Sequence, residues 1–168
     1  MTVRSACWPW AAARNDPASP GRISRWSRNS AARWSSGWAT LDLCTGDLSY
    51  ASAGHPPPLL SYGPGHAEYL DNPAGTMLGV PGGGVFAAGR LGLSPGTGLL
   101  LYTDGLIEDH GRDITEGLNA LAATMRSASG LTAEQNCQAV QAALLGSSPR
   151  SDDVCVLAAR FNGWGPSR

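Results

Sequence analysis

The sequence contains no lysine, because all twelve of its basic residues are arginine. It has no apolar run close to the ~18 residues that a bilayer span requires, so we expect no membrane partner. It has no Cys-x-x-Cys pair, and its four widely spaced cysteines exclude a zinc-ribbon type of site. The apolar stretch after Arg4 is too short for a signal peptide, since Pro9 interrupts it and Arg14 ends it. We therefore expect a cytoplasmic protein with free thiols, in which Cys137 and Cys155 are buried.

Leucine and acidic residues are scarce in the first 38 residues. This segment has six arginines, five of the six tryptophans, one acid (Asp16) and no leucine. A basic, aromatic segment of this kind is one way to bind nucleic acid. The absence of any helical or strand period instead favours a disordered segment, or one that is foreign to the domain. We therefore expect no nucleic-acid partner, and we divide the chain into residues 1–38, a domain at residues 39–161 and a tail at residues 162–168.

The remaining pattern predicts one globular domain that is rich in short strands. Of the 168 residues, 42% are hydrophobic and 15% are charged, which is typical of a folded chain. Apolar and polar residues alternate over residues 41–51 around a Cys-Thr-Gly-Asp turn, which predicts a β-hairpin. Further strands are predicted at residues 59–62, 68–70, 85–88, 99–102 and 154–159. The continuous apolar run at residues 99–102 indicates a strand that is buried on both faces.

Two helices are predicted between the last two strands. Asp113 is the expected N-cap of the first, with Glu116 three residues later, and Thr132 is the expected N-cap of the second, with Gln135 at the corresponding position. The predicted apolar face of the first helix is Ile114, Leu118, Leu121 and Met125. That of the second is Cys137, either Val140 or Gln141, and Leu144. A series of strands, two helices and a final strand together indicate an α+β layered domain.

Three acidic residues lie at the ends of predicted strands. Asp104 directly follows the strand at residues 99–102 and precedes Gly105, and the pair Asp152 and Asp153 directly precedes the last strand. Carboxylates that come together in a dry site are costly unless a cation neutralises them, and hard divalent cations prefer oxygen ligands. The pattern therefore indicates a Mg²⁺ or Mn²⁺ site formed by Asp104 with Asp152 and Asp153. An alternative stays open, in which Asp104 caps an Asp-Gly turn and Asp152 caps the entry to the strand.

Three sequence motifs together carry a family resemblance. Residues 39–60 hold the hairpin and the run Ala-Gly-His-Pro-Pro-Pro, residues 100–108 are Leu-Leu-Tyr-Thr-Asp-Gly-Leu-Ile-Glu, and residues 151–157 are Ser-Asp-Asp-Val-Cys-Val-Leu. In this order the motifs resemble the C-terminal half of the SpoIIE-type branch of the PPM, protein phosphatase 2C-like, metal-dependent protein phosphatases. The resemblance implies a sandwich of two antiparallel sheets flanked by helices. It also implies hydrolysis of phosphoserine or phosphothreonine on proteins by a water molecule that two Mn²⁺ or Mg²⁺ ions activate.

The resemblance implies site residues and a partner. By position, Asp104 and Asp152 would be metal ligands, and Asp153, Gly105 and Glu108 would be weaker members of the site. Asp153 would be an alternative ligand, and Glu108 matches a position associated with an additional metal ion. Glu108 is equally well interpreted as an ordinary acidic residue of the surface. The implied partner is a phosphorylated anti-sigma factor antagonist, which is a bacterial signalling protein.

The chain departs from the family pattern before residue 39. The first half of the family's domain supplies an aspartate that bridges the two metal ions, whereas the acid in this part of the chain is Asp16, in an Asn-Asp-Pro context. We therefore expect a domain that is incomplete at its N-terminus. The alternative function is a non-catalytic, phosphatase-like interaction module that lacks the bridging aspartate.

Four other polar residues are considered for the site. His55 invites a role as a general acid, but its position before three prolines favours a local packing or capping role. Arg90, Arg112 and Arg150 are candidates for a contact with phosphate, and no spacing singles one of them out.

Overall fold

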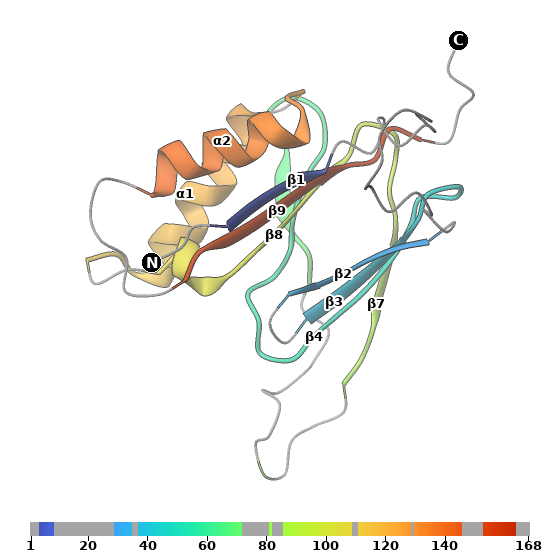
Figure 1. The fold of residues 1–168 in the computed structure, drawn as a ribbon, viewed down its shortest axis with the longest axis horizontal. Helices are drawn as coiled ribbons and strands as arrows, with labels where there is room; N and C mark the ends of the chain where they lie inside the picture. Colours follow the sequence, from blue (N-terminus) through green and yellow to red (C-terminus); the bar gives the residue numbers. More distant parts are fainter. Residues whose placement is uncertain are drawn as a thin grey trace, which may run out of the picture.

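The chain is arranged in three layers, in which two helices, a five-stranded sheet and a four-stranded sheet lie one upon another (Figure 1). The computed structural model describes residues 4–8, 29–34, 37–71, 81, 86–108, 111–128, 130–145 and 153–163. Within these ranges, no helix combines the length and the apolar character that a membrane crossing needs.

The two sheets have simple topologies. The order of the first sheet is β1 (Arg4–Trp8), β9 (Cys155–Arg160), β8 (Gly98–Tyr102), β5 (Leu59–Ser61) and β6 (Ala67–Tyr69). The order of the second is β2 (Asn29–Trp34), β3 (Gly37–Asp42), β4 (Asp47–Ser52) and β7 (Gly89–Gly92). Every pairing is antiparallel except that of β1 with β9, which is parallel. The expected α+β sandwich is therefore confirmed, with this one parallel pair.

Two of the strands, β1 and β2, fall within residues 1–38, and they pair with β9 and β3 respectively. The division of the chain at residue 38 stays a prediction, as does the tail at residues 162–168.

Strand β8 separates two hydrophobic clusters that the described residues form. Its residues are all buried, and successive side chains of a strand point to opposite faces. Leu100 and Tyr102 pack in the cluster that includes the helices, whereas Leu99 and Leu101 pack in the cluster between the two sheets. The prediction of a strand that is buried on both faces is confirmed, because β8 lies in the middle layer.

The helices α1 (Ile114–Ser127) and α2 (Ala133–Leu144) cover the face of the first sheet that is turned away from the second sheet (Figure 1). Both predicted N-caps are confirmed. The Asp113 carboxylate accepts a hydrogen bond from the Thr115 N–H at 2.6 Å, and this bond holds the pKa of Asp113 below its usual value. In α2, Thr132 and Gln135 form a complete capping box.

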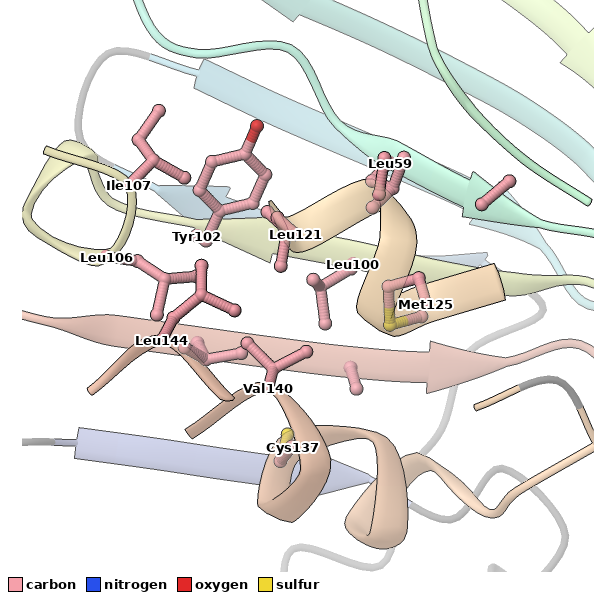
Figure 2. Close-up of a cluster of buried hydrophobic side chains, with 14 of the residues drawn as sticks. Leu59, Leu100, Tyr102, Leu106, Ile107, Leu121, Met125, Cys137, Val140 and Leu144 are labelled. Carbon is pink, nitrogen blue, oxygen red and sulfur yellow. The ribbon is translucent and has the colours of Figure 1, made fainter. Parts of the chain in front are cut away.

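The apolar side chains of the helices meet the sheet in one cluster (Figure 2). Its labelled members are Leu59, Leu100, Tyr102, Leu106, Ile107, Leu121, Met125, Cys137, Val140 and Leu144. The predicted face of α2 is confirmed, but that of α1 is wrong at its first residue, because Ile114 is 43% exposed. At this end α1 contacts the core through Gly117, whose backbone packs against the Ile107 carbonyl. A large side chain is not used there.

Two predictions of strand bounds need correction. The strand expected at residues 85–88 is β7, at Gly89–Gly92, and residues 86–88 lie outside any strand. The ladder with β4 pairs Tyr50 with Gly89, where the tyrosine ring occupies the space that a side chain would need. The last strand begins at Cys155, one residue later than expected.

Cys155 is exposed, although it was expected to be buried, whereas Cys137 is buried as expected. Cys155, Leu157 and Ala159 share the face of β9 that is turned toward the second sheet, and their burial increases in that order. Among the described residues, the second sheet therefore does not cover the beginning of β9, and that part of the sandwich is open at the end where Cys155 lies.

Candidate metal centre

Asp104 lies where the buried strand β8 ends and the chain turns. Thr103 is still extended, and the 3-10 turn η2 (Asp104–Leu106) follows it directly. Asp104 is exposed, and its Oδ1 accepts a hydrogen bond from the Gly105 N–H at 3.0 Å. The next two residues, Leu106 and Ile107, are fully buried, and the Ile107 N–H donates to the Asp104 carbonyl at 2.9 Å. An exposed carboxylate is thus presented by a turn that the core holds rigidly.

Asp153 lies next to this turn, two residues before the last strand. The β8–β9 ladder brings Tyr102 opposite Val156. Beyond it, the Thr103 hydroxyl donates to the Asp153 carbonyl at 2.9 Å. Asp153 is also exposed. The structure therefore brings the backbone of Asp153 next to the turn of Asp104 at the open end of the sandwich. The positions of these residues at strand ends predict this proximity.

The other predicted site residues have different surroundings. Gly105 is buried within the turn, and Glu108 is exposed and donates its N–H to the Asp104 carbonyl at 2.9 Å. Asp152 lies outside the described residues. Among the residues that are described, no group of three or more His, Cys, Asp or Glu side chains is close enough to hold a metal ion. Of the predicted site residues, the described ranges therefore bring Asp153 next to the turn of Asp104 and Glu108, and metal binding by these residues stays a prediction.

His55 has a longer-range contact than its sequence context indicates. The side chain is buried, and Nε2 lies 2.6 Å from the Tyr102 carbonyl, two residues before Asp104. Because a carbonyl only accepts, Nε2 carries the proton and donates. Burial holds the pKa of His55 below its usual value, while the bond to the Tyr102 carbonyl and the Asp104 charge oppose that shift. His55 therefore supports the end of β8, which carries Asp104. The local sequence His-Pro-Pro-Pro does not predict this contact, because its partner is Tyr102.

Arg112 makes structural contacts within the fold, and the phosphate contact that the sequence left open is not what these contacts show. Its guanidinium donates to the carbonyls of Leu106 at 2.7 Å, of Ile107 at 3.2 Å and of Leu144 at 3.4 Å. It thus joins the turn after Asp104 to the end of α2. The other two candidates remain predictions: Arg90 is exposed on β7, and Arg150 lies outside the described residues.

A comparison with protein families identifies the domain. The family model for Stage II sporulation protein E (SpoIIE) matches residues 35–162, which is well over half of the chain. The chain belongs to the SpoIIE family. The match includes both acidic motifs, at residues 100–108 and 151–157.

Solved structures agree with this membership. The RsbU and RsbW domains of Rv1364c from Mycobacterium tuberculosis match with a TM-score of 0.68 and 31% identity, over 77% of this chain and 36% of that chain. The phosphatase domain of SpoIIE from Bacillus subtilis matches with a TM-score of 0.58 and 18% identity, over 76% of this chain and 56% of that one. The SiaA-PP2C domain of Pseudomonas aeruginosa matches with a TM-score of 0.51 and 21% identity, over 74% and 50%.

The SpoIIE and SiaA matches establish the fold as that of a PP2C-type phosphatase domain, and the family is one of phosphatases. The chain spans 36% of the Rv1364c chain and 56% and 50% of the other two. The activities, substrates and partners of these whole proteins are therefore assigned to this chain only as a proposal.

Proposed function

We propose that this chain provides the C-terminal acidic motifs of a metal-dependent protein phosphatase, which hydrolyses phosphoserine or phosphothreonine on a bacterial signalling protein. The observation that carries the proposal is the junction at Thr103, which brings the Asp104 turn next to the segment of Asp153. Membership of the SpoIIE family supports the phosphatase class. The RsbU-containing structure supports a partner of the anti-sigma factor antagonist type.

The donor chemistry of the site fits Mn²⁺ or Mg²⁺. Both described acids offer carboxylate oxygens, which are the ligands that hard divalent cations prefer. Asp104 and Asp153 alone are too few for a closed site, so Asp152 is proposed as a second main ligand beside Asp104, with Asp153 as the alternative. When bound, two such ions supply a water molecule that is activated for attack on phosphorus.

The residues of the chain have distinct roles in this proposal. Asp104 and Asp152 bind the metal, and Asp153 is an alternative ligand. Gly105 and Glu108 are weaker members of the site, and Glu108 binds an additional ion. The exposed Cys44 and Cys155 are free thiols, which supports a reducing, cytoplasmic location as part of the same proposal.

The experiment is a calorimetric titration of Mn²⁺ into the full chain and into the variants Asp104→Asn, Asp152→Asn and Glu116→Gln. Glu116 is an exposed acid in the first turn of α1 and serves as the matched control. Release of phosphate from a phosphoserine peptide is measured on the same samples. We expect the two aspartate variants to weaken Mn²⁺ binding at least about tenfold, since each loses a charged ligand, while the control stays within about twofold.

The two functions that the sequence left open, a phosphatase and a non-catalytic interaction module, predict different results. Mn²⁺ binding together with phosphate release that both aspartate variants abolish would support the enzyme. Mn²⁺ binding that neither variant changes, with no phosphate release, would reject it in favour of the non-catalytic interaction module.

A further inference from the structure

The side chain of Thr103 connects the two acidic motifs directly. Its hydroxyl donates to the Asp153 carbonyl at 2.9 Å and accepts a hydrogen bond from the Cys155 N–H, also at 2.9 Å. Its own N–H donates to the Cys155 carbonyl at 3.0 Å. Thr103 is thus bonded three times to the segment 153–155, and Asp104 is the residue that follows it.

The hydroxyl continues the pairing of β8 and β9 beyond the regular ladder. The ladder has its last pair at Tyr102 and Val156. Past this point the chain at residues 153–154 is outside the strand. The hydroxyl replaces a main-chain partner there, because it can donate to one backbone group and accept from another at the same time. An aliphatic side chain of the same shape could do neither.

Other residues hold the Asp104 turn from different sides. His55 donates to the Tyr102 carbonyl, and Arg112 donates to the carbonyls of Leu106 and Ile107. These contacts fix the turn relative to the Pro-rich segment, residues 55–58, and to the helices. The contact of Thr103 differs, because it fixes the turn relative to the other acidic motif.

We infer that Thr103 is a positioning residue, whose hydroxyl sets the spacing between Asp104 and Asp153 so that the carboxylates of these two residues act on one divalent cation. This inference rests on the proposed function. The open end of the sandwich explains why a side-chain clamp is needed there, since the exposed Cys155 lies beyond the cover of the second sheet.

The test compares the full chain with Thr103→Val, which removes the hydroxyl and keeps the shape, and with Thr103→Ser, which keeps the hydroxyl. Thr124→Val is the matched control, because the Thr124 hydroxyl donates to the Ala120 carbonyl within α1. One measurement is the hydrogen-exchange rate of the Cys155 amide by NMR. The other is the calorimetric affinity for Mn²⁺.

We expect Thr103→Val to speed exchange of the Cys155 amide about tenfold, because that amide loses its acceptor. We expect the same variant to weaken Mn²⁺ binding about 10- to 100-fold, as is usual when a residue that orients metal ligands is removed. Thr103→Ser and Thr124→Val should remain within about threefold of the wild type in both measurements. A residue that only fills space would not be rescued by serine.

Each other outcome has a definite meaning. If Thr103→Val changes neither measurement, or if serine behaves like valine, the inference is overturned while the proposed function stands. Faster exchange with unchanged Mn²⁺ affinity also overturns it. If the wild type binds no Mn²⁺, the cation site of the proposed function fails and the inference about Thr103 fails with it, whereas an unaltered affinity in Thr103→Val overturns the inference alone. If Thr103→Val does not fold, Thr103→Ala replaces it, and failure of both to fold would assign Thr103 to folding instead of positioning.

Discussion

His55 and Tyr102 each bind the backbone of the other's segment. The His55 imidazole donates to the Tyr102 carbonyl at 2.6 Å, and the Tyr102 hydroxyl donates to the Pro57 carbonyl at 2.9 Å. Burial raises the pKa of the Tyr102 phenol, so that it remains a donor over the whole physiological range. The end of β8 and the Pro-rich segment are therefore fixed to each other by two reciprocal bonds immediately before Asp104.

The first prediction concerns pH. Because burial lowers the pKa of His55 below its ordinary value of 6.5, the folded chain holds this imidazole neutral where the unfolded chain already binds a proton. The contribution of His55 to stability should be complete above pH 6.5 and should be lost as the pH falls through the lower pKa of the folded state. Urea unfolding of the wild type and of His55→Gln, measured from pH 5 to pH 8, tests this.

His55→Gln should cost about 1 kcal/mol at pH 8 for the lost hydrogen bond, and its stability should fall less steeply toward pH 5 than that of the wild type. His66→Gln is the control, because His66 is exposed in a turn. A variant that keeps the full pH dependence of the wild type would assign that dependence to other groups.

The second prediction concerns the contact of α1 with the turn after Asp104. A Cβ atom at Gly117 would overlap the carbonyl and the Cα of Ile107, so Gly117→Ala must push α1 away from that turn. We expect a loss of about 2 kcal/mol or more, in spite of the better helix propensity of alanine. Gly111→Ala is the matched control, because a Cβ there meets nothing within 4 Å. Thermal unfolding of both variants measures the difference, and equal stability would show that α1 shifts without cost.

The local signals of the sequence predict much of this fold. The capping box of Thr132 and Gln135 and the run at residues 99–102 depend on neighbouring residues, and both are confirmed. The predicted burial of Ile114 and Cys155 is wrong, because burial depends on where a distant layer ends. Periodicity gives the face of an element but not how far its partner extends.

The candidate site divides in the same way. Asp104 is marked by its position after a buried strand, and the structure brings Asp153 next to it. Thr103 and His55 are not marked, because their partners lie about 50 residues away along the chain. Such contacts depend on the register of β8 against β9 and β5, which no local pattern specifies.

The third prediction separates the two ends of the α1 apolar face. Leu121 is fully buried among the helices and the first sheet, whereas Ile114 is 43% exposed. Leu121→Ala should cost about 2–5 kcal/mol, because it removes buried methyl groups and leaves a cavity, while Ile114→Ala should cost less than about 1 kcal/mol. Urea unfolding of both variants provides the comparison. A large loss of unfolding free energy for Ile114→Ala would show that Ile114 packs against a part of the chain outside the described residues.

The fourth prediction concerns Arg112, which joins the turn after Asp104 to the end of α2. Arg112→Met keeps the apolar stem and removes the donors to Leu106, Ile107 and Leu144. We expect a loss of about 2–3 kcal/mol in unfolding free energy, because a charged donor that serves several carbonyls has no substitute in methionine. Arg90→Met, on the exposed edge strand β7, should stay within about 0.5 kcal/mol of the wild type.

Amide exchange locates the effect of Arg112→Met. The Glu108 N–H donates to the Asp104 carbonyl within the turn that Arg112 holds, so its exchange should accelerate in the variant. The amides of Leu100 and Ala158, paired in the middle of the first sheet, should keep their relative protection. If all amides accelerated equally, Arg112 would stabilise the domain as a whole. If only the turn responded, Arg112 would be the residue through which the end of α2 controls the position of Asp104.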